Sequence, residues 1–176
     1  MKEDHAMKLK KIIAAATAAA AAFVFTACSI RIADSDEMTE KDYALEKQEQ
    51  VLECFEKQDK KELKALFCRY VIKNDEALDE QIDEALDFID GKIVSHGDTK
   101  PSKSGDEDKM KYSAYTQKVT TESGREYKIS FEGWYEYREE PDKLGITRIL
   151  VIDTSVEVDP SKTGKDNGIY SIGLNE

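Results

Sequence analysis

The spacing of apolar residues changes at Gly91, and no other feature of the chain constrains its fold as strongly. Before Gly91, apolar residues recur every three or four positions, which predicts amphipathic helices. After Gly91 they alternate with polar residues, which predicts strands that bury one face. Helices followed by antiparallel strands indicate an α+β domain, in which the N-terminal helices pack on one face of a curved sheet.

Three apolar stripes with helical spacing precede this change. They run through Leu45, Gln48, Val51, Leu52 and Phe55, then Leu63, Leu66, Phe67 and Tyr70, then Leu78, Ile82, Ala85, Leu86 and Ile89. Thr39 with Asp42, and Asp59 with Glu62, have the spacing of helix N-terminal caps. We therefore predict helices that begin near Thr39 and after Asp59, and a third helix that ends at Gly91.

The part of the chain after Gly91 predicts an antiparallel sheet. Residues 93–94 are compatible with a short strand, and residues 97–109 are rich in Gly, Ser, Lys and Asp, which predicts a loop. Residues 110–121 and 146–153 are predicted strands. Residues 122–125 (Glu-Ser-Gly-Arg) predict a hairpin turn, because a glycine readily adopts a positive φ.

Alternation along the strand that follows this turn assigns its residues to two faces. The more apolar face holds Tyr127, Ile129, Phe131, Tyr135 and Tyr137, and the other holds Lys128, Ser130, Glu132, Trp134 and Glu136. Trp134 is therefore predicted to be a large exposed aromatic residue on a polar face, which is typical of contact surfaces. The alternative is a β-bulge at Gly133 that turns Trp134 toward the core.

Four short sequence patterns resemble known families. Phe55, Asp59, Leu63, Leu66 and Phe67, spaced Phe-x3-Asp-x3-Leu-x2-Leu-Phe, resemble the opening of nuclear-transport-factor-2-like (SnoaL-like) domains. That resemblance implies a long helix, a break at an acidic residue and a second helix over a cone-shaped sheet. Residues 79–91, 141–146 and 168–170 resemble a narrower group of uncharacterised bacterial lipoproteins that share a domain of unknown function. This resemblance implies a fold and an envelope location, and it supplies no active-site residues.

Residues 1–27 have the parts of a secretory signal. A lysine-rich start around Met7 precedes an uncharged apolar stretch at residues 12–25, and small residues follow. This stretch is shorter than the roughly 20 apolar residues that a transmembrane helix needs. We therefore predict that residues 1–27 form a signal peptide, with Met1 and Met7 as alternative starts.

The end of this signal, Phe25-Thr26-Ala27-Cys28, resembles a lipobox, which directs diacylglycerol onto the cysteine thiol. The resemblance implies a lipoprotein held in the cell membrane by lipid on Cys28, because two or three acyl chains give stable anchoring. The alternative is an uncleaved signal anchor. Residues 28–38 are polar and acidic, which predicts a flexible tether. The α+β cone domain, residues 39–176, would then lie on the extracytoplasmic side.

The charge of the chain argues against one class of partner. The formal net charge is −11, and residues 1–27 hold four lysines and two acidic residues, so processing would leave −13. This charge repels nucleic-acid phosphates and no basic stripe opposes it, so we predict no nucleic-acid binding. We also predict no cofactor, since no sequence motif indicates one.

The remaining histidine and cysteines limit the chemistry. His96 is the only histidine left after processing, so we predict no histidine-based metal site. The acidic runs at residues 34–37 and 106–108 lack the alternating ligand spacing of a calcium loop, so we predict no metal site there either. His96 is either a proton donor or acceptor in the mouth of the cone or an ordinary surface residue. Cys54 and Cys68 lie in adjoining predicted helices at an axial offset of roughly 7 Å, which suits a disulfide poorly. We predict buried thiols, with a disulfide as the alternative.

The candidate binding residues are Trp134, Tyr127, Tyr135 and His96. Aromatic rings with polar tips suit a half-wet pocket, although they are also ordinary residues of strands. The leading hypothesis is a non-catalytic module that binds a small molecule, a peptide or another envelope protein. The alternative, based on fold analogy, is a small isomerase- or hydratase-type enzyme with an acid-base residue inside the cone. A third hypothesis is a homodimer formed through the sheet.

Overall fold

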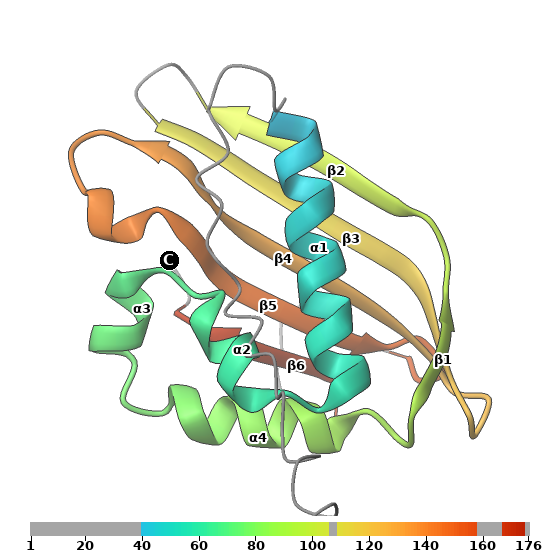
Figure 1. The fold of residues 1–176 in the computed structure, drawn as a ribbon. Helices are drawn as coiled ribbons and strands as arrows, with labels where there is room; N and C mark the ends of the chain where they lie inside the picture. Colours follow the sequence, from blue (N-terminus) through green and yellow to red (C-terminus); the bar gives the residue numbers. More distant parts are fainter. Residues whose placement is uncertain (1–39, 106–108, 158–166, 175–176) are drawn as a thin grey trace, which may run out of the picture. The chain divides into compact units, whose positions relative to one another are not determined.

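Helices come first and strands follow, so the domain is α+β (Figure 1). The computed structural model describes residues 40–105, 109–157 and 167–174, all within the compact unit Asp36–Glu176. The predicted signal peptide, Cys28 and the tether lie outside the described residues. The elements are α1 (Glu40–Lys57), α2 (Lys60–Ala65), α3 (Arg69–Asn74), α4 (Leu78–Phe88), β1 (Ile93–His96), β2 (Thr99–Gly105), β3 (Lys109–Thr121), β4 (Glu126–Tyr137), the 3-10 helix η1 (Pro141–Lys143), β5 (Gly145–Asp153) and β6 (Ile169–Gly173).

The start of α2 is capped as the sequence predicts, but the helix is shorter than its apolar stripe. Asp59 Oδ1 accepts a hydrogen bond from the Glu62 backbone N–H at 3.0 Å. The stripe from Leu63 to Tyr70 is nevertheless divided between α2 and α3. The reason is that the Cys68 N–H donates to Ile146 O at 2.9 Å, which ties the chain to β5 and interrupts the helical hydrogen bonds.

The third predicted helix is present as α4, and Tyr127 helps to end it. Leu78, Ile82, Ala85 and Leu86 are buried, as the third stripe requires. The helix ends at Phe88, before the predicted stop at Gly91, which instead has a φ of +87° in the following turn. The Tyr127 hydroxyl accepts from the Asp90 N–H at 2.9 Å and donates to Phe88 O at 3.4 Å, so it satisfies backbone groups left free at this end.

Six antiparallel strands form one sheet in the order β1-β3-β4-β5-β6, and β2 also pairs with β3. The β3–β4 hairpin turns where predicted, and Gly124 has a φ of +84°. The predicted loop at 97–109 is wrong in part, because residues 99–105 form β2, which pairs with residues 110–116 of β3. The Ser, Lys and Gly residues of β2 lack the apolar alternation of a strand that buries one face. The strand forms because its backbone hydrogen-bonds to the longer strand β3, and not because its side chains are buried.

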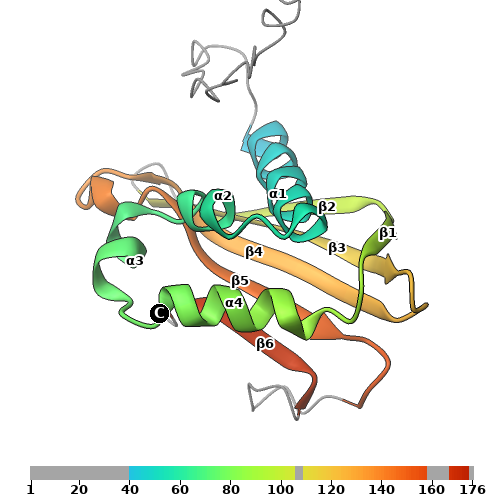
Figure 2. The ribbon, with the colours of Figure 1, turned by 60° about the horizontal axis from the view of Figure 1, so that its bottom comes forward.

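The described helices all lie on one face of the sheet, as Figure 2 shows. α1 packs over β2, β3 and the adjoining part of β4, and α4 packs over β6. Residues that face the helices are almost fully buried, among them Tyr112, Ala114, Tyr127, Ile129, Phe131, Ile149 and Val151. No described helix or strand covers the opposite face, whose side chains on β3, β4 and β5 are half-buried.

One buried polar side chain positions α1 on the sheet. Gln48, which is fully buried, donates through Nε2 to Ile129 O at 3.0 Å and to Thr116 Oγ1 at 3.3 Å. Thr116 in turn is 2.8 Å from Thr99 Oγ1 on β2. Buried amides need such partners, so these bonds favour one placement of α1 along the strands.

Backbone segments approach closely where β4 ends and β5 begins. A Cβ at Gly133 would overlap Gly145 O and lie 2.9 Å from Ile146 Cα. Beside this contact Lys111 pairs with Trp134 and Met110 with Glu136, so Tyr135 is an extra residue, as in a β-bulge. The bulge moves Tyr137 away from the helical face, and its predicted place beside Tyr127 is therefore wrong.

This contact yields a prediction about stability. Gly133→Ala should lower the free energy of unfolding by at least about 2 kcal/mol, because the new methyl group meets backbone atoms that cannot rotate away. Gly97→Ala is the matched control: its Cβ would have its nearest neighbours at 3.7 Å, so its effect should stay within about 0.5 kcal/mol. Urea unfolding of both variants measures the difference, and equal effects would contradict the close approach.

Candidate functional site

The uncovered face of the sheet carries two rows of side chains. Directly opposed residues of neighbouring strands share a face, so the pairing register defines each row. One row is Lys100, Tyr115, Ser130, Leu150 and Ser171, and the next is Ser102, Ser113, Glu132 and Arg148. Together they form a mixed polar and aromatic surface across five strands.

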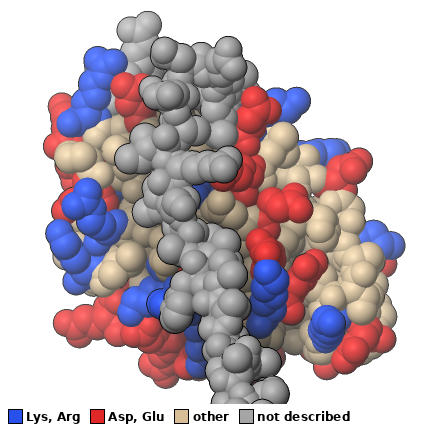
Figure 3. All heavy atoms as spheres, in the orientation of Figure 1, with Lys and Arg blue, Asp and Glu red and all other residues tan. Residues whose placement is uncertain are grey.

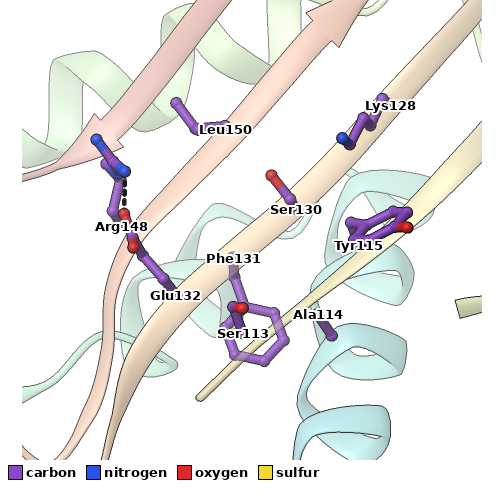
Figure 4. Close-up of a pocket in the computed structure, with 9 residues that line it drawn as sticks. All are labelled: Ser113, Ala114, Tyr115, Lys128, Ser130, Phe131, Glu132, Arg148 and Leu150. Carbon is purple, nitrogen blue, oxygen red and sulfur yellow. Dashed lines mark ion pairs between the residues drawn. The ribbon is translucent and has the colours of Figure 1, made fainter. Parts of the chain in front are cut away.

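These rows enclose a shallow depression, which we call the sheet-face hollow. It has a volume of about 220 Å³ and is lined by the side chains of Ser113, Tyr115, Lys128, Ser130, Glu132, Arg148 and Leu150, and by Ala114 and Phe131. In Figure 4, Lys128 and Tyr115 lie on one side of the hollow, the Arg148–Glu132 pair lies on the other, and Ser130 and Leu150 lie between them. Because it combines apolar side chains with convergent polar groups, this hollow is a candidate ligand site.

Charged side chains of the hollow are held in defined positions. Glu132 forms ion pairs with Arg148 and with Lys111, the latter at 3.2 Å. Lys128 Nζ lies 4.5 Å from the centre of the Tyr115 ring, a cation–π contact. These side chains are half-buried, so their charged groups reach solvent at the rim of the hollow. The ion pairs and the cation–π contact fix the direction in which each charged group points.

Trp134 lies on the same uncovered face as the hollow. Its ring is half-buried and lies 5.0 Å from that of Tyr137, and Lys111 Nζ lies 5.5 Å from its centre. The face is the one that alternation predicts, and the irregularity at Gly133 does not turn the ring toward the core. The predicted full exposure is not observed, because Tyr137 and Lys111 pack on the ring. A role of Trp134 in binding stays a prediction.

The other two aromatic candidates face the helices. Tyr127 is fully buried, and its hydroxyl bonds to the end of α4. Tyr135 is half-buried against Tyr43 and Tyr112, with ring centres 5.1 and 6.3 Å away. Both residues therefore pack the α1 and α4 side of the sheet, away from Trp134. Their proposed part in binding stays a prediction.

His96 ends β1 and is exposed to solvent. Its Nδ1 lies 3.4 Å from Gly97 O, the backbone of the next residue. It lines neither the sheet-face hollow nor a second depression between the ends of α1 and α4, of about 500 Å³. Within the described residues, no cluster of three or more His, Cys, Asp or Glu side chains is placed to hold a metal ion.

Cys54 and Cys68 are buried thiols, as predicted, and no disulfide joins them. Burial, together with the nearby carboxylates of Asp59 and Glu62, raises the pKa of Cys54 to about 12. A nucleophilic cysteine needs a lowered pKa, so this environment opposes thiol chemistry at Cys54.

We predict that the folded chain resists thiol alkylation. In full-length protein carrying Cys28→Ala, Cys54 should not react with iodoacetamide at pH 8, where on the order of one thiol in 10⁴ is ionised. In guanidinium chloride both remaining cysteines should react fully. Mass spectrometry of the native sample is decisive, since rapid labelling of Cys54 would show that it is accessible.

The residues of the hollow were only partly visible in the sequence. Alternation separates Lys128, Ser130 and Glu132 from the core face, but nothing in the sequence aligns them with Arg148 or Tyr115. That alignment depends on the strand register, which the bulges beside β4 shift. Polar residues at every second position of the predicted strand after the hairpin turn were the available signal.

Residues 50–154 match the family described as domain of unknown function DUF5104. The chain belongs to this family. The matched segment runs from the middle of α1 to the end of β5, so it includes every residue that lines the sheet-face hollow. No curated protein matches the chain.

Proposed function

We propose that this DUF5104 protein is a membrane-anchored extracytoplasmic lipoprotein that acts as a non-catalytic ligand- or protein-binding module. The observation that carries this proposal is the uncovered sheet face, in which the sheet-face hollow gathers hydroxyl, charged and aromatic side chains. A large solvent-facing sheet surface with such groups suits recognition. The lipid on Cys28 would hold this surface at the membrane.

The order of elements supports a nuclear-transport-factor-2-like (SnoaL-like) cone as the fold. A long helix, α1, stops before Asp59, a second helix follows, and an antiparallel sheet lies beneath them (Figure 1). These are the features that the sequence resemblance implies.

The packing supports binding over catalysis. An isomerase-type enzyme needs an acid-base residue in an enclosed site. Between α1 and the sheet, the side chains of Leu52, Phe55, Tyr112 and Phe131 are almost fully buried and belong to one apolar cluster. The sheet-face hollow is open to solvent, and His96 lies outside it.

None of the helices described in residues 40–105, 109–157 and 167–174 is long and apolar enough to cross a membrane. In this proposal the lipid on Cys28 supplies the anchor. Cys28→Ala should move the protein from the membrane fraction to the soluble fraction, or leave it as the longer precursor, because no thiol accepts the lipid. Fractionation and metabolic labelling with palmitate measure this, with Cys54→Ala as the control that keeps its lipid. An unchanged distribution of Cys28→Ala would refute the anchor.

The binding role is tested on the full-length chain carrying Cys28→Ala. Extracytoplasmic extract should shift the NMR signals of the Ser113, Ser130 and Leu150 amides, which line the hollow. Ser130→Arg fills the hollow and should abolish the shifts, whereas Glu49→Arg, on an exposed position of α1, should keep them. Shifts confined to other parts of the chain, or no shifts, would count against the proposal.

A further inference from the structure

The sheet-face hollow has a charge opposite in sign to the net charge of the chain. Lys128, Arg148 and Glu132 line the hollow, and Lys100 and Lys111 occupy strand positions beside it. The chain as a whole carries −11. On the helical side, charges of both signs are interspersed (Figure 3). A local excess of cations on an acidic protein attracts anions to that place.

Two of these cations have no acidic partner in the part of the chain that the structure describes. Neither Lys100 nor Lys128 forms an ion pair with a carboxylate there. The ring of Tyr115 holds the Lys128 ammonium group without neutralising its charge. Glu132 forms ion pairs with both Lys111 and Arg148.

Hydroxyl and apolar groups complete the hollow. Ser113 and Ser130 present hydroxyls, which donate hydrogen bonds to an anion. Leu150 and the ring of Tyr115 offer apolar contact between the two charged sides (Figure 4). A cavity of about 150 Å³ can hold a benzene ring, so the volume of about 220 Å³ has room for one ring and its substituent.

We propose that the sheet-face hollow binds a small organic carboxylate built on a single compact ring. The carboxylate lies near Lys128 and the hydroxyl of Ser130, and the ring lies against Leu150 and Tyr115. This proposal rests on the proposed binding function and adds the chemical class of the ligand. Charge complementarity selects the anion, and the size of the hollow limits its body.

Benzoate is the probe, and benzamide is its neutral counterpart of nearly equal shape. Each is titrated at low salt into the ¹⁵N-labelled full-length chain carrying Cys28→Ala. Benzoate should shift the Tyr115, Ser130 and Leu150 amides and bind at least about threefold more tightly than benzamide, with an affinity that falls as salt rises. Equal binding of the two compounds would overturn the proposal.

Matched variants separate the local charge from the net charge. Lys128→Met keeps a long side chain over Tyr115, removes the ammonium group and should weaken benzoate binding about fivefold. Lys61→Met removes the same charge from an exposed position of α2 and should change nothing. Glu132→Gln should tighten binding. If Lys128→Met behaves like Lys61→Met in a folded chain, the proposal is wrong.

Trp134 supplies a second measurement, because it is the only tryptophan of the chain and lies on the same face. Iodide should quench its fluorescence more strongly than caesium, despite the negative net charge, and Lys128→Met should reduce this difference. Stronger quenching by caesium would show that the face is not positive and would overturn the proposal.

Other occupants of the face are distinguished in the same experiments. A tri-aspartate peptide that binds more tightly than benzoate would identify an acidic protein segment as the ligand. Shifts at the hollow that depend on protein concentration would identify a second copy of the chain. Either result overturns the ring carboxylate. If benzoate fails while envelope extract still shifts these amides, the ligand class is wrong and the binding function stands; if both fail, both are wrong.

Discussion

The close approach of backbone at Gly133 and Gly145 determines how several parts of the fold meet. A side chain at Gly133 would overlap Gly145 O, so β4 can cross the start of β5 only because this position has no Cβ. The crossing places Ile146 where it accepts the Cys68 N–H, and this bond ends α2 and separates it from α3. The adjoining bulge at Tyr135 brings Tyr137 to the ring of Trp134. The boundary between α2 and α3 and the contact between Trp134 and Tyr137 thus both lie beside the position where β4 tolerates no Cβ.

Tyrosine and other polar side chains have different roles on the two faces of the sheet. Toward the helices, Tyr127 and Gln48 are fully buried and hold α4 and α1 through hydrogen bonds to the backbone. Such buried polar groups stabilise one arrangement, because any shift leaves them unpaired. On the uncovered face, Tyr115 and Lys128 remain half-buried, with Lys128 Nζ 4.5 Å from the ring, and face solvent. The rigid inner layer therefore positions the outer side chains, as a binding surface requires.

Electrostatics connects this surface to the rest of the chain. An overall charge of −11 keeps the protein apart from anionic surfaces and polymers. The cations around the sheet-face hollow change that balance locally, within roughly one Debye length of about 10 Å. Composition alone hides this contrast, because it averages over both faces.

The sequence by itself determined the α+β order, the cap at Asp59, the β3–β4 turn and the face on which Trp134 lies. These features depend on local spacing, which periodicity and short-range hydrogen bonds record directly. Only the tertiary structure decided that residues 99–105 form a strand, that α2 and α3 are separate, and that Tyr137 leaves the face that Tyr127 and Tyr135 share. It also decided which residues form the hollow, since Tyr115, Ser130 and Arg148 meet through strand register. Register is set by long-range pairing and by the bulges beside Gly133, and a single sequence without its partners in space does not contain that information.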